Sequence, residues 1–193
     1  MNHTAAVKLA NEFVEWLRDC CLRIEIVGSV KRADKDDVGD IELLLIADSI
    51  TPRPEFGQKV IYKNRLEQRL AQLVREGVLQ QARKKADGDK LKRLAIVEYS
   101  GVEDFCIELF IVRVETWGIQ NVIRTGPREF SKRFVSNKNR GGLLPNHLEY
   151  IKGETKIIDH DQNGETLSLP EEADALAILG LGWIDPGQRR KYG

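Results

Sequence analysis

Hydrophobic residues recur at helical spacing in two stretches of the first half of the chain. Between residues 5 and 20, apolar side chains follow each other at steps of three and four, as in a helix with one buried face. Residues 62–76 repeat this period with leucines, and Gly77 follows as a C-cap. We therefore expect an amphipathic helix in each stretch.

Short apolar runs bounded by turn residues predict strands. The expected strands cover residues 23–27, 40–46, 78–84, 92–99 and 105–112, with a turn at Asp87-Gly88. Beyond residue 112 the pattern predicts short helices at 115–123, 128–135 and 170–179, extended segments at 148–151 and 156–159, and a tail from residue 180. This change of pattern indicates a domain boundary near residue 113.

The charge of the chain is balanced in total but uneven in its distribution. The sequence has 30 Lys and Arg residues and 30 Asp and Glu residues. Basic residues concentrate in 53–93 and 124–140, and acidic residues in 34–42 and 159–174. A neutral total can therefore hide a basic face beside an acidic pocket, and such a face suits a polyanion.

The sequence predicts an intracellular protein that does not enter a membrane. No apolar run approaches the length of a membrane span, and the first residues lack a signal-peptide pattern. The cysteines are Cys20, Cys21 and Cys106, and they show no metal-ligand spacing. Because reduced thiols are typical of intracellular proteins, we expect a cytoplasmic location or, for a viral protein, the host cell.

Two carboxylates interrupt the apolar run of residues 40–46. Residues two apart on a strand point to the same face, so Asp40 and Glu42 should converge while Ile41 and Leu43 face the core. Two anions held this close repel each other unless a cation lies between them. A hard divalent cation such as Mg²⁺, which prefers oxygen ligands, would satisfy both.

The Gly28-Ser29 pair at the end of the preceding strand predicts contact with phosphate. Glycine lets a phosphate approach the backbone, whose N–H groups can form an anion-binding nest. Ser29 adds a hydroxyl, and Lys31 and Arg32 add positive charge that can grip phosphate oxygens. Together these residues could hold a nucleoside triphosphate against metal ions.

A third carboxylate, Glu108, interrupts the apolar strand of residues 106–112. We expect this strand to lie beside the strand that carries Asp40 and Glu42. Three carboxylates could bind two metal ions about 3.5–4 Å apart, the arrangement that stabilises the attacking and leaving oxygens in phosphoryl transfer. A lone Asp-x-Glu is more often a solvent-facing strand edge, but its combination with Gly28-Ser29 and Glu108 favours a functional site.

These residues resemble a known family. The resemblance begins with Gly28-Ser29-Val30-Lys31-Arg32 and Gly39-Asp40-Ile41-Glu42, which look like the signature of the nucleotidyltransferase superfamily and, in the Gly-Ser-x-x-Arg form, of family X DNA polymerases such as DNA polymerase β. Residues 106–112 resemble the strand with the third metal ligand, and Thr125-Gly126 part of the Tyr-Phe-Thr-Gly-Ser motif. Residues 146–150 and 170–186 are similar to the family's Asn-Glu-Tyr strand and C-terminal ending.

The resemblance implies an α+β fold in two parts. Residues 1–113 would form a nucleotidyltransferase palm, a mixed β-sheet flanked by helices, and residues 114–193 a small C-terminal α/β subdomain that selects the nucleotide. One helix precedes the motif, so we expect neither the lyase domain nor the helix-hairpin-helix region of the family. A protein partner could replace them.

The implied activity is that of a minimal DNA polymerase that fills gaps during DNA repair. It would transfer a nucleotide from a dNTP to the primer 3′-hydroxyl of a primer-template or gapped duplex. Asp40, Glu42 and Glu108 would be the catalytic residues and bind two Mg²⁺ ions, or Mn²⁺, and Glu108 would also accept the hydroxyl proton. The nucleotide would contact Gly28, Ser29, Arg32 and Gly39 at its phosphates and Ile123, Arg124, Thr125 and Gly126 at its sugar.

Several residues near the metal ions and the nucleotide depart from the family pattern. Glu42 and Glu108 stand where the family usually has Asp, and Cys106 where it often has Arg. Ile123 and Arg124 replace the Tyr-Phe pair beside the ribose 2′ position, so we expect weak rejection of ribonucleotides.

The helix after Thr125-Gly126 also departs from the pattern. Ser131 and Val135 replace residues that face the minor groove, so we expect poor checking of the template. Family members bend after the Thr-Gly pair through a cis Gly–Ser bond. Because a cis bond costs about 0.5–1 kcal/mol before proline but about 2.5–4 before other residues, we expect a cis bond at Gly126-Pro127.

Other functions remain open at this stage. One alternative is a nucleotidyltransferase that works without a template or modifies an acceptor other than DNA. Another is a catalytically weak nucleic-acid-binding module that keeps the fold. The segment Asp159-His160-Asp161 could mimic a metal site, but the neighbouring Asn163-Gly164 favours a solvated turn.

Overall fold

The chain folds into two units whose division does not follow the order of the sequence. The computed structural model describes residues 1–50, 63–83, 90–99 and 101–193. The first unit comprises residues 1–26 and 35–111, and the second comprises residues 27–34 and 112–193. The turn expected at Asp87-Gly88 lies outside the described residues.

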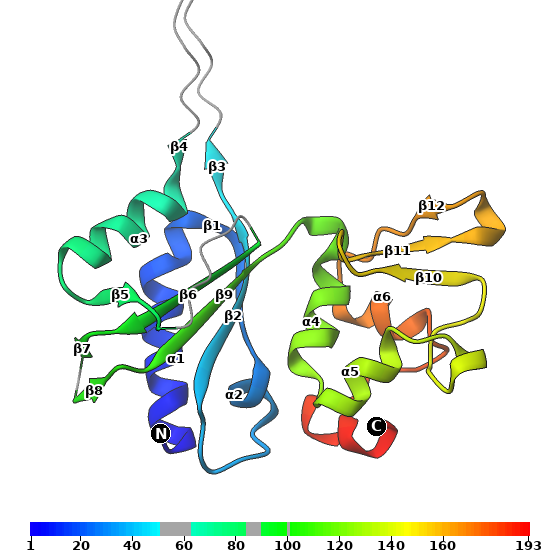
Figure 1. Cartoon of the computed structure of the whole chain (residues 1–193), viewed down its shortest axis with the longest axis horizontal. Helices are drawn as coiled ribbons and strands as arrows, with labels where there is room; N and C mark the ends of the chain where they lie inside the picture. Colours follow the sequence, from blue (N-terminus) through cyan, green and yellow to red (C-terminus); the bar gives the residue numbers. More distant parts are fainter. Residues whose placement is uncertain (51–62, 84–89, 100) are drawn as a thin grey trace, which may run out of the picture. The chain divides into compact units, whose positions relative to one another are not determined.

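A five-stranded mixed β-sheet forms the frame of the first unit (Figure 1). Its strands lie in the order β1 (Cys21–Val27), β2 (Asp40–Ala47), β9 (Cys106–Ile111), β6 (Leu91–Ile96) and β5 (Leu79–Gln81). β2 and β9 are parallel, whereas β6 is antiparallel to both β9 and β5. The predicted α+β class is therefore confirmed.

Short antiparallel pairs extend this unit. β3 (Ser49–Ile50) pairs with β4 (Lys63–Asn64), and β7 (Glu98–Tyr99) pairs with β8 (Val102–Glu103). The expected strand of residues 92–99 is thus divided into β6 and β7.

The two predicted amphipathic helices cover one face of the sheet. α1 (His3–Leu17), followed by the 3-10 turn η1 (Arg18–Cys20), passes behind the strands in Figure 1 and buries Ala6, Leu9, Ala10, Phe13, Val14 and Leu17. α3 (Arg65–Arg75) buries Leu66, Leu70 and Leu73. Lys92 of β6 is buried on this face, with its Nζ 2.6 Å from Oε1 of Glu67 in α3. The opposite face of the sheet is therefore the one that can present polar residues to a ligand.

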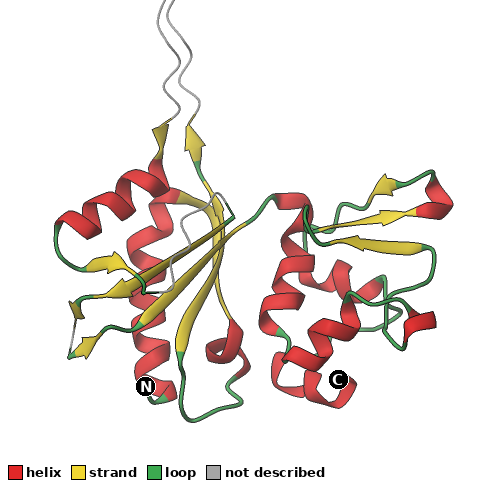
Figure 2. Ribbon diagram, in the orientation of Figure 1, coloured by secondary structure: helices red, strands yellow, loops and turns green. Residues whose placement is uncertain are grey.

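The second unit combines short helices with a small antiparallel sheet (Figure 2). Its helices are α2 (Gly28–Arg32), α4 (Trp117–Thr125), α5 (Arg128–Phe134) and α6 (Glu172–Ala177), with 3-10 segments η2 (Val114–Thr116), η3 (Lys138–Arg140), η4 (His160–Gln162) and η5 (Pro186–Tyr192). The sheet contains β10 (Leu148–Ile151), β11 (Lys156–Asp159) and β12 (Glu165–Thr166). The extended segments expected at 148–151 and 156–159 are confirmed.

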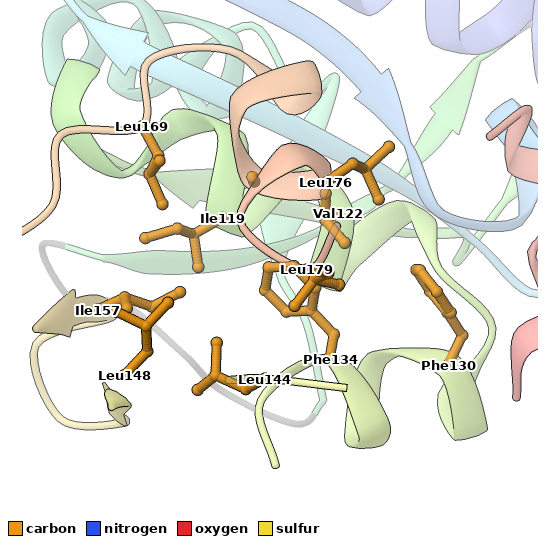
Figure 3. Close-up of a cluster of buried hydrophobic side chains, with 11 residues drawn as sticks. Ile119, Val122, Phe130, Phe134, Leu144, Leu148, Ile157, Leu169, Leu176 and Leu179 are labelled. Carbon is orange, nitrogen blue, oxygen red and sulfur yellow. The ribbon is translucent and has the colours of Figure 1, made fainter. Parts of the chain in front are cut away.

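Side chains from all these layers meet in one hydrophobic cluster (Figure 3). α4 contributes Ile119 and Val122, and α5 contributes Phe130 and Phe134, all fully buried. The remaining members come from the sheet, α6 and the connecting loops: Leu144, Leu148, Ile157, Leu169, Ala175, Leu176 and Leu179. All members of this cluster belong to the second unit, so the cluster is a hydrophobic core of that unit.

The C-terminal residues are more ordered than expected. The predicted tail from residue 180 is wrong, because residues 186–192 form η5 and Asp185 caps it by accepting from the Gly187 N–H at 2.9 Å. α6 begins later than predicted because Glu171 and Asp174 form a capping box that sets its first turn, and it also ends earlier, at Ala177.

Arg189 of η5 forms a buried ion pair with Glu172 of α6. Its Nη1 lies 2.7 Å from Glu172 Oε1, and the side chain of Arg189 is 0% exposed. Its Nε and Nη2 donate to the Ile184 carbonyl oxygen at 3.2 and 3.1 Å. Because Nε, Nη1 and Nη2 of Arg189 each have an acceptor, the buried positive charge is compensated.

Replacing Arg189 should therefore destabilise the second unit. The change Arg189→Met keeps much of the bulk but removes the main partner of the buried Glu172 carboxylate. We expect the free energy of unfolding in urea to fall by about 3–5 kcal/mol. The matched change at the exposed Arg140, Arg140→Met, should cost less than about 0.5 kcal/mol. Similar effects of both substitutions would contradict the assignment.

Candidate functional site

The register of β2 and β9 places the predicted carboxylates on adjacent strands. Glu42 lies directly opposite Glu108, and Asp40 lies opposite Cys106. All four side chains are half-buried, whereas Ile41, Leu43, Ile107 and Leu109 between them are fully buried. Asp40, Glu42 and Glu108 thus share the face of the sheet that α1 and α3 do not cover.

The oxygen ligands that Asp40, Glu42 and Glu108 offer are of the type that a hard divalent cation prefers. The three side chains remain partly accessible to solvent, as Mg²⁺ and Mn²⁺ require. Among the residues that the structure describes, however, the ligand atoms of these three carboxylates do not all lie within 4.8 Å of one another. Metal binding would therefore require the side chains to adjust.

A cation from the basic run of residues 53–93 lies beside one of these carboxylates. Arg93 of β6 lies opposite Glu108 in the antiparallel register, and its Nε donates to Glu108 Oε1. This hydrogen bond raises the pKa of Arg93. The two-residue period of a strand could have predicted that Arg93 shares one face of β6 with Leu91 and Ala95. It could not have predicted that Arg93 lies opposite Glu108.

Cys106 lies on the same face, between Asp40 and the neighbouring β6 strand. Burial raises the pKa of its thiol, and the charges of Glu108 and Asp40 raise it further. The thiol is therefore held in its protonated form at neutral pH.

The predicted phosphate-binding segment belongs to the second unit. Gly28 has a positive φ of 69°, which glycine adopts without strain, and α2 begins at this residue. Gly28 and Ser29 are buried, and Lys31 and Arg32 are half-buried.

Hydrogen bonds join this segment to α4 within the second unit. Arg32 Nη1 donates to the carbonyl oxygens of Thr125 and Gly126 at 3.1 and 3.5 Å. Lys31 Nζ donates to Asn121 Oδ1 at 3.0 Å, and the Thr125 hydroxyl donates to the same oxygen at 3.1 Å. The structure therefore brings Arg32, Thr125 and Gly126 together, as a shared nucleotide site would require.

Asp34 balances the charge of Arg32. Its Oδ2 accepts from Arg32 Nε at 3.3 Å and from Arg190 Nη2 at 2.8 Å. Burial alone would raise the pKa of Asp34, but the charges and hydrogen bonds of the two arginines outweigh burial and hold the pKa below its usual value.

The residues expected beside the sugar have different surroundings. Ile123 packs against the hydrophobic cluster of the second unit, and Arg124 is half-buried. Burial raises the pKa of Tyr150, although a hydrogen bond with Gln120 and the charge of Arg124 act in the opposite direction. Arg124 therefore lies near the Tyr150 phenol. The Ser131 hydroxyl donates to the Ile123 carbonyl oxygen at 2.8 Å.

The predicted cis bond at Gly126-Pro127 is wrong, since the described residues contain no cis peptide. Gly126 has φ −65° and ψ 147°, and Pro127 has φ −61° and ψ 152°. Two successive extended residues turn the chain from α4 into α5, so the bend needs no cis bond.

Gly39, just before Asp40, is exposed, and no atom lies within 4 Å of where its Cβ would be. The described fold therefore does not itself require glycine at this position.

A second cluster of ligand-type atoms occurs in the small sheet. His147, Asp159 and Asp161 bring one ligand atom each within 4.8 Å of the others. Asp159 already caps η4 by accepting from the Asp161 N–H at 2.9 Å, and Asn163 adopts the left-handed conformation, so the predicted turn is present. Because His147 and Asp161 are exposed and Asp159 caps η4, we interpret this cluster as a structural turn.

None of the helices in the described part of the chain has both the length and the apolar content that crossing a bilayer requires. A scan against protein-family models and a search of the curated proteins find no match for this chain. The resemblance to family X DNA polymerases therefore rests on the motif residues alone.

The contacts of Asp34 predict a pH dependence of stability. Its pKa is lower in the folded protein than the value near 3.9 of an unfolded chain. The contribution of its ion pairs is thus complete above about pH 4 and disappears as the pH falls through the lower folded pKa. In urea unfolding measured from pH 7 to pH 2, Asp34→Asn should be less stable than the native protein at pH 7, and the difference should shrink in acid. A constant difference would contradict this.

Proposed function

We propose that this protein is a metal-dependent nucleotidyltransferase of the family X DNA polymerase type. The observation that carries the proposal is the parallel register that sets Glu42 beside Glu108, with Asp40 on the same half-buried face. A merely solvated strand edge is a weaker explanation, because β2 and β9 are neighbouring central strands of the sheet.

Asp40, Glu42 and Glu108 would hold two Mg²⁺ ions, or Mn²⁺. When bound, such ions neutralise the triphosphate and lower the pKa of the attacking hydroxyl. Glu108 would accept the proton of the acceptor 3′-hydroxyl, whose oxygen forms a bond to the α-phosphorus. The bond from this phosphorus to the bridging oxygen of the β-phosphate breaks, and pyrophosphate leaves.

The second unit would bind the nucleotide. Arg32 is half-buried and offers a guanidinium to phosphate, whereas Gly28 and Ser29 are buried and would have to become exposed before their N–H groups and the Ser29 hydroxyl could contact it. The hydrogen bonds of Arg32 to Thr125 and Gly126 support a role for residues 123–126 beside the sugar. The open surroundings of Gly39 suit a residue next to a ligand.

Arg65, Arg69 and Arg75 lie along α3 and line one depression of the surface. This helix covers the face of the sheet opposite to the carboxylates, so these residues could contact nucleic-acid phosphates only away from the proposed reaction centre. The nature of the acceptor therefore rests on the resemblance to family X DNA polymerases. We propose primer-template or gapped DNA as the acceptor, in the context of repair, together with a partner protein that supplies further DNA-binding surface.

Ser131 favours a second outcome. Its hydroxyl is held by the Ile123 carbonyl oxygen rather than presented to a base pair. Addition without a template is therefore the alternative that the experiment must distinguish.

The direct test is primer extension on a gapped duplex with Mg²⁺ or Mn²⁺ and each dNTP offered singly. We expect template-matched addition that Asp40→Asn and Glu108→Gln each reduce by at least about 10³-fold, because both ligate the ions that the transition state requires.

The control is Asp37→Asn, which removes a carboxylate that is 90% exposed and lies outside β2. It should retain activity. Nucleotide addition that does not depend on the template would support a template-independent nucleotidyltransferase. No addition by the native protein on any primer would contradict the proposal.

Sugar selectivity provides a second test. Ile123 packs into the core, and no aromatic pair stands at positions 123 and 124 to exclude a 2′-hydroxyl. We expect kcat/KM for a matched dNTP to exceed that for the rNTP by less than about 100-fold, the range that one steric contact supplies. A ratio of 10⁴ or more in single-nucleotide insertion would show that another residue excludes the ribose.

A further inference from the structure

The ion pair between Arg93 and Glu108 lies among the proposed metal ligands. Their side chains are only 23% and 15% exposed, and they occupy opposed positions on β6 and β9. Asp40 also acts on Arg93, because its charge contributes to the raised pKa of this guanidinium. Arg93 is thus a fixed positive charge within the carboxylate face of the sheet.

Such a charge has two opposite effects on a metal site. It orients Glu108, since a carboxylate that accepts from a guanidinium on the neighbouring strand loses rotational freedom. It also opposes metal binding, because it occupies one oxygen of Glu108 and repels any dication that approaches.

Space next to the pair allows the guanidinium to move. A hollow lined by Ala82, Arg83, Ala95, Asp104 and Cys106 adjoins both Arg93 and Glu108. Arg93 could therefore withdraw from Glu108 without displacing core residues. The other arginine of this hollow, Arg83, pairs with Asp104 at 2.6 Å.

We propose that Glu108 is shared between Arg93 and a divalent ion, and that Arg93 is a positioning residue which aligns Glu108 while weakening the affinity of the empty protein for metal. This inference rests on the proposed function, since it takes Glu108 as a metal ligand. It predicts that affinity for metal and catalytic rate respond in opposite directions when Arg93 loses its charge.

The experiment compares Arg93→Met with the native protein by Mn²⁺ titration without nucleotide, followed by electron paramagnetic resonance of the free ion. We expect Arg93→Met to bind Mn²⁺ about tenfold more tightly, because a unit charge a few ångströms from a dication has this effect even at high dielectric. At saturating metal, kcat of primer extension should fall at least about tenfold, because Glu108 is no longer aligned.

Two further variants separate this role from a general loss of charge or structure. Arg83→Met removes a guanidinium from the same hollow without touching Glu108 and should change Mn²⁺ affinity by less than about twofold. Arg93→Lys keeps the charge but not the fork of donors, so its Mn²⁺ affinity should stay near the native value while kcat is only partly restored.

The outcomes distinguish this inference from the proposed function. If the native protein binds Mn²⁺ and Asp40→Asn abolishes binding, the metal site stands. In that case, unchanged or weaker Mn²⁺ binding by a folded Arg93→Met protein overturns the inference alone. If neither the native protein nor any of these variants binds Mn²⁺, the metal site and this inference both fail.

Discussion

The parallel pairing of β2 with β9 is the constraint on which the candidate site depends. The two strands are distant in sequence, yet their register aligns Glu42 with Glu108 and leaves Asp40 on the same face. A shift of one residue would turn one strand's carboxylates toward α1 and α3. The fully buried Ile41, Leu43, Ile107 and Leu109 oppose such a shift, because it would bring them out of the core. Hydrophobic burial on one face therefore fixes the polar chemistry on the other.

Two charged residues of the proposed site, Glu108 and Arg32, already have partners within their own unit. Glu108 accepts from Arg93 in the first unit, while in the second Arg32 is held by Asp34 and the Thr125 carbonyl oxygen. These contacts compensate half-buried charges, which would otherwise be costly. A substrate or metal at the proposed site would then have to replace one of these contacts. Its binding would be weaker as a result, but the side chains would already be oriented.

The sequence was sufficient for the features that depend on local pattern. Alternation and apolar period predicted β10, β11, α1 and the carboxylate face of β2, because each follows from neighbouring residues. It was insufficient where a long-range contact decides. Arg93 meets Glu108 only through the β6–β9 register, and Arg189 is buried only because Glu172 and the Ile184 carbonyl oxygen surround its guanidinium. The prediction of a cis bond at Gly126-Pro127 was wrong, because these two residues are extended and turn the chain from α4 into α5 without one.

The segment of residues 27–34 belongs to the second unit, although the chain on either side of it belongs to the first. It lies in sequence between β1 and β2, but its side chains bond to Asn121, Thr125 and Arg190 of the second unit. The proposed phosphate and sugar contacts are therefore made by one unit, and the proposed metal ligands by the other.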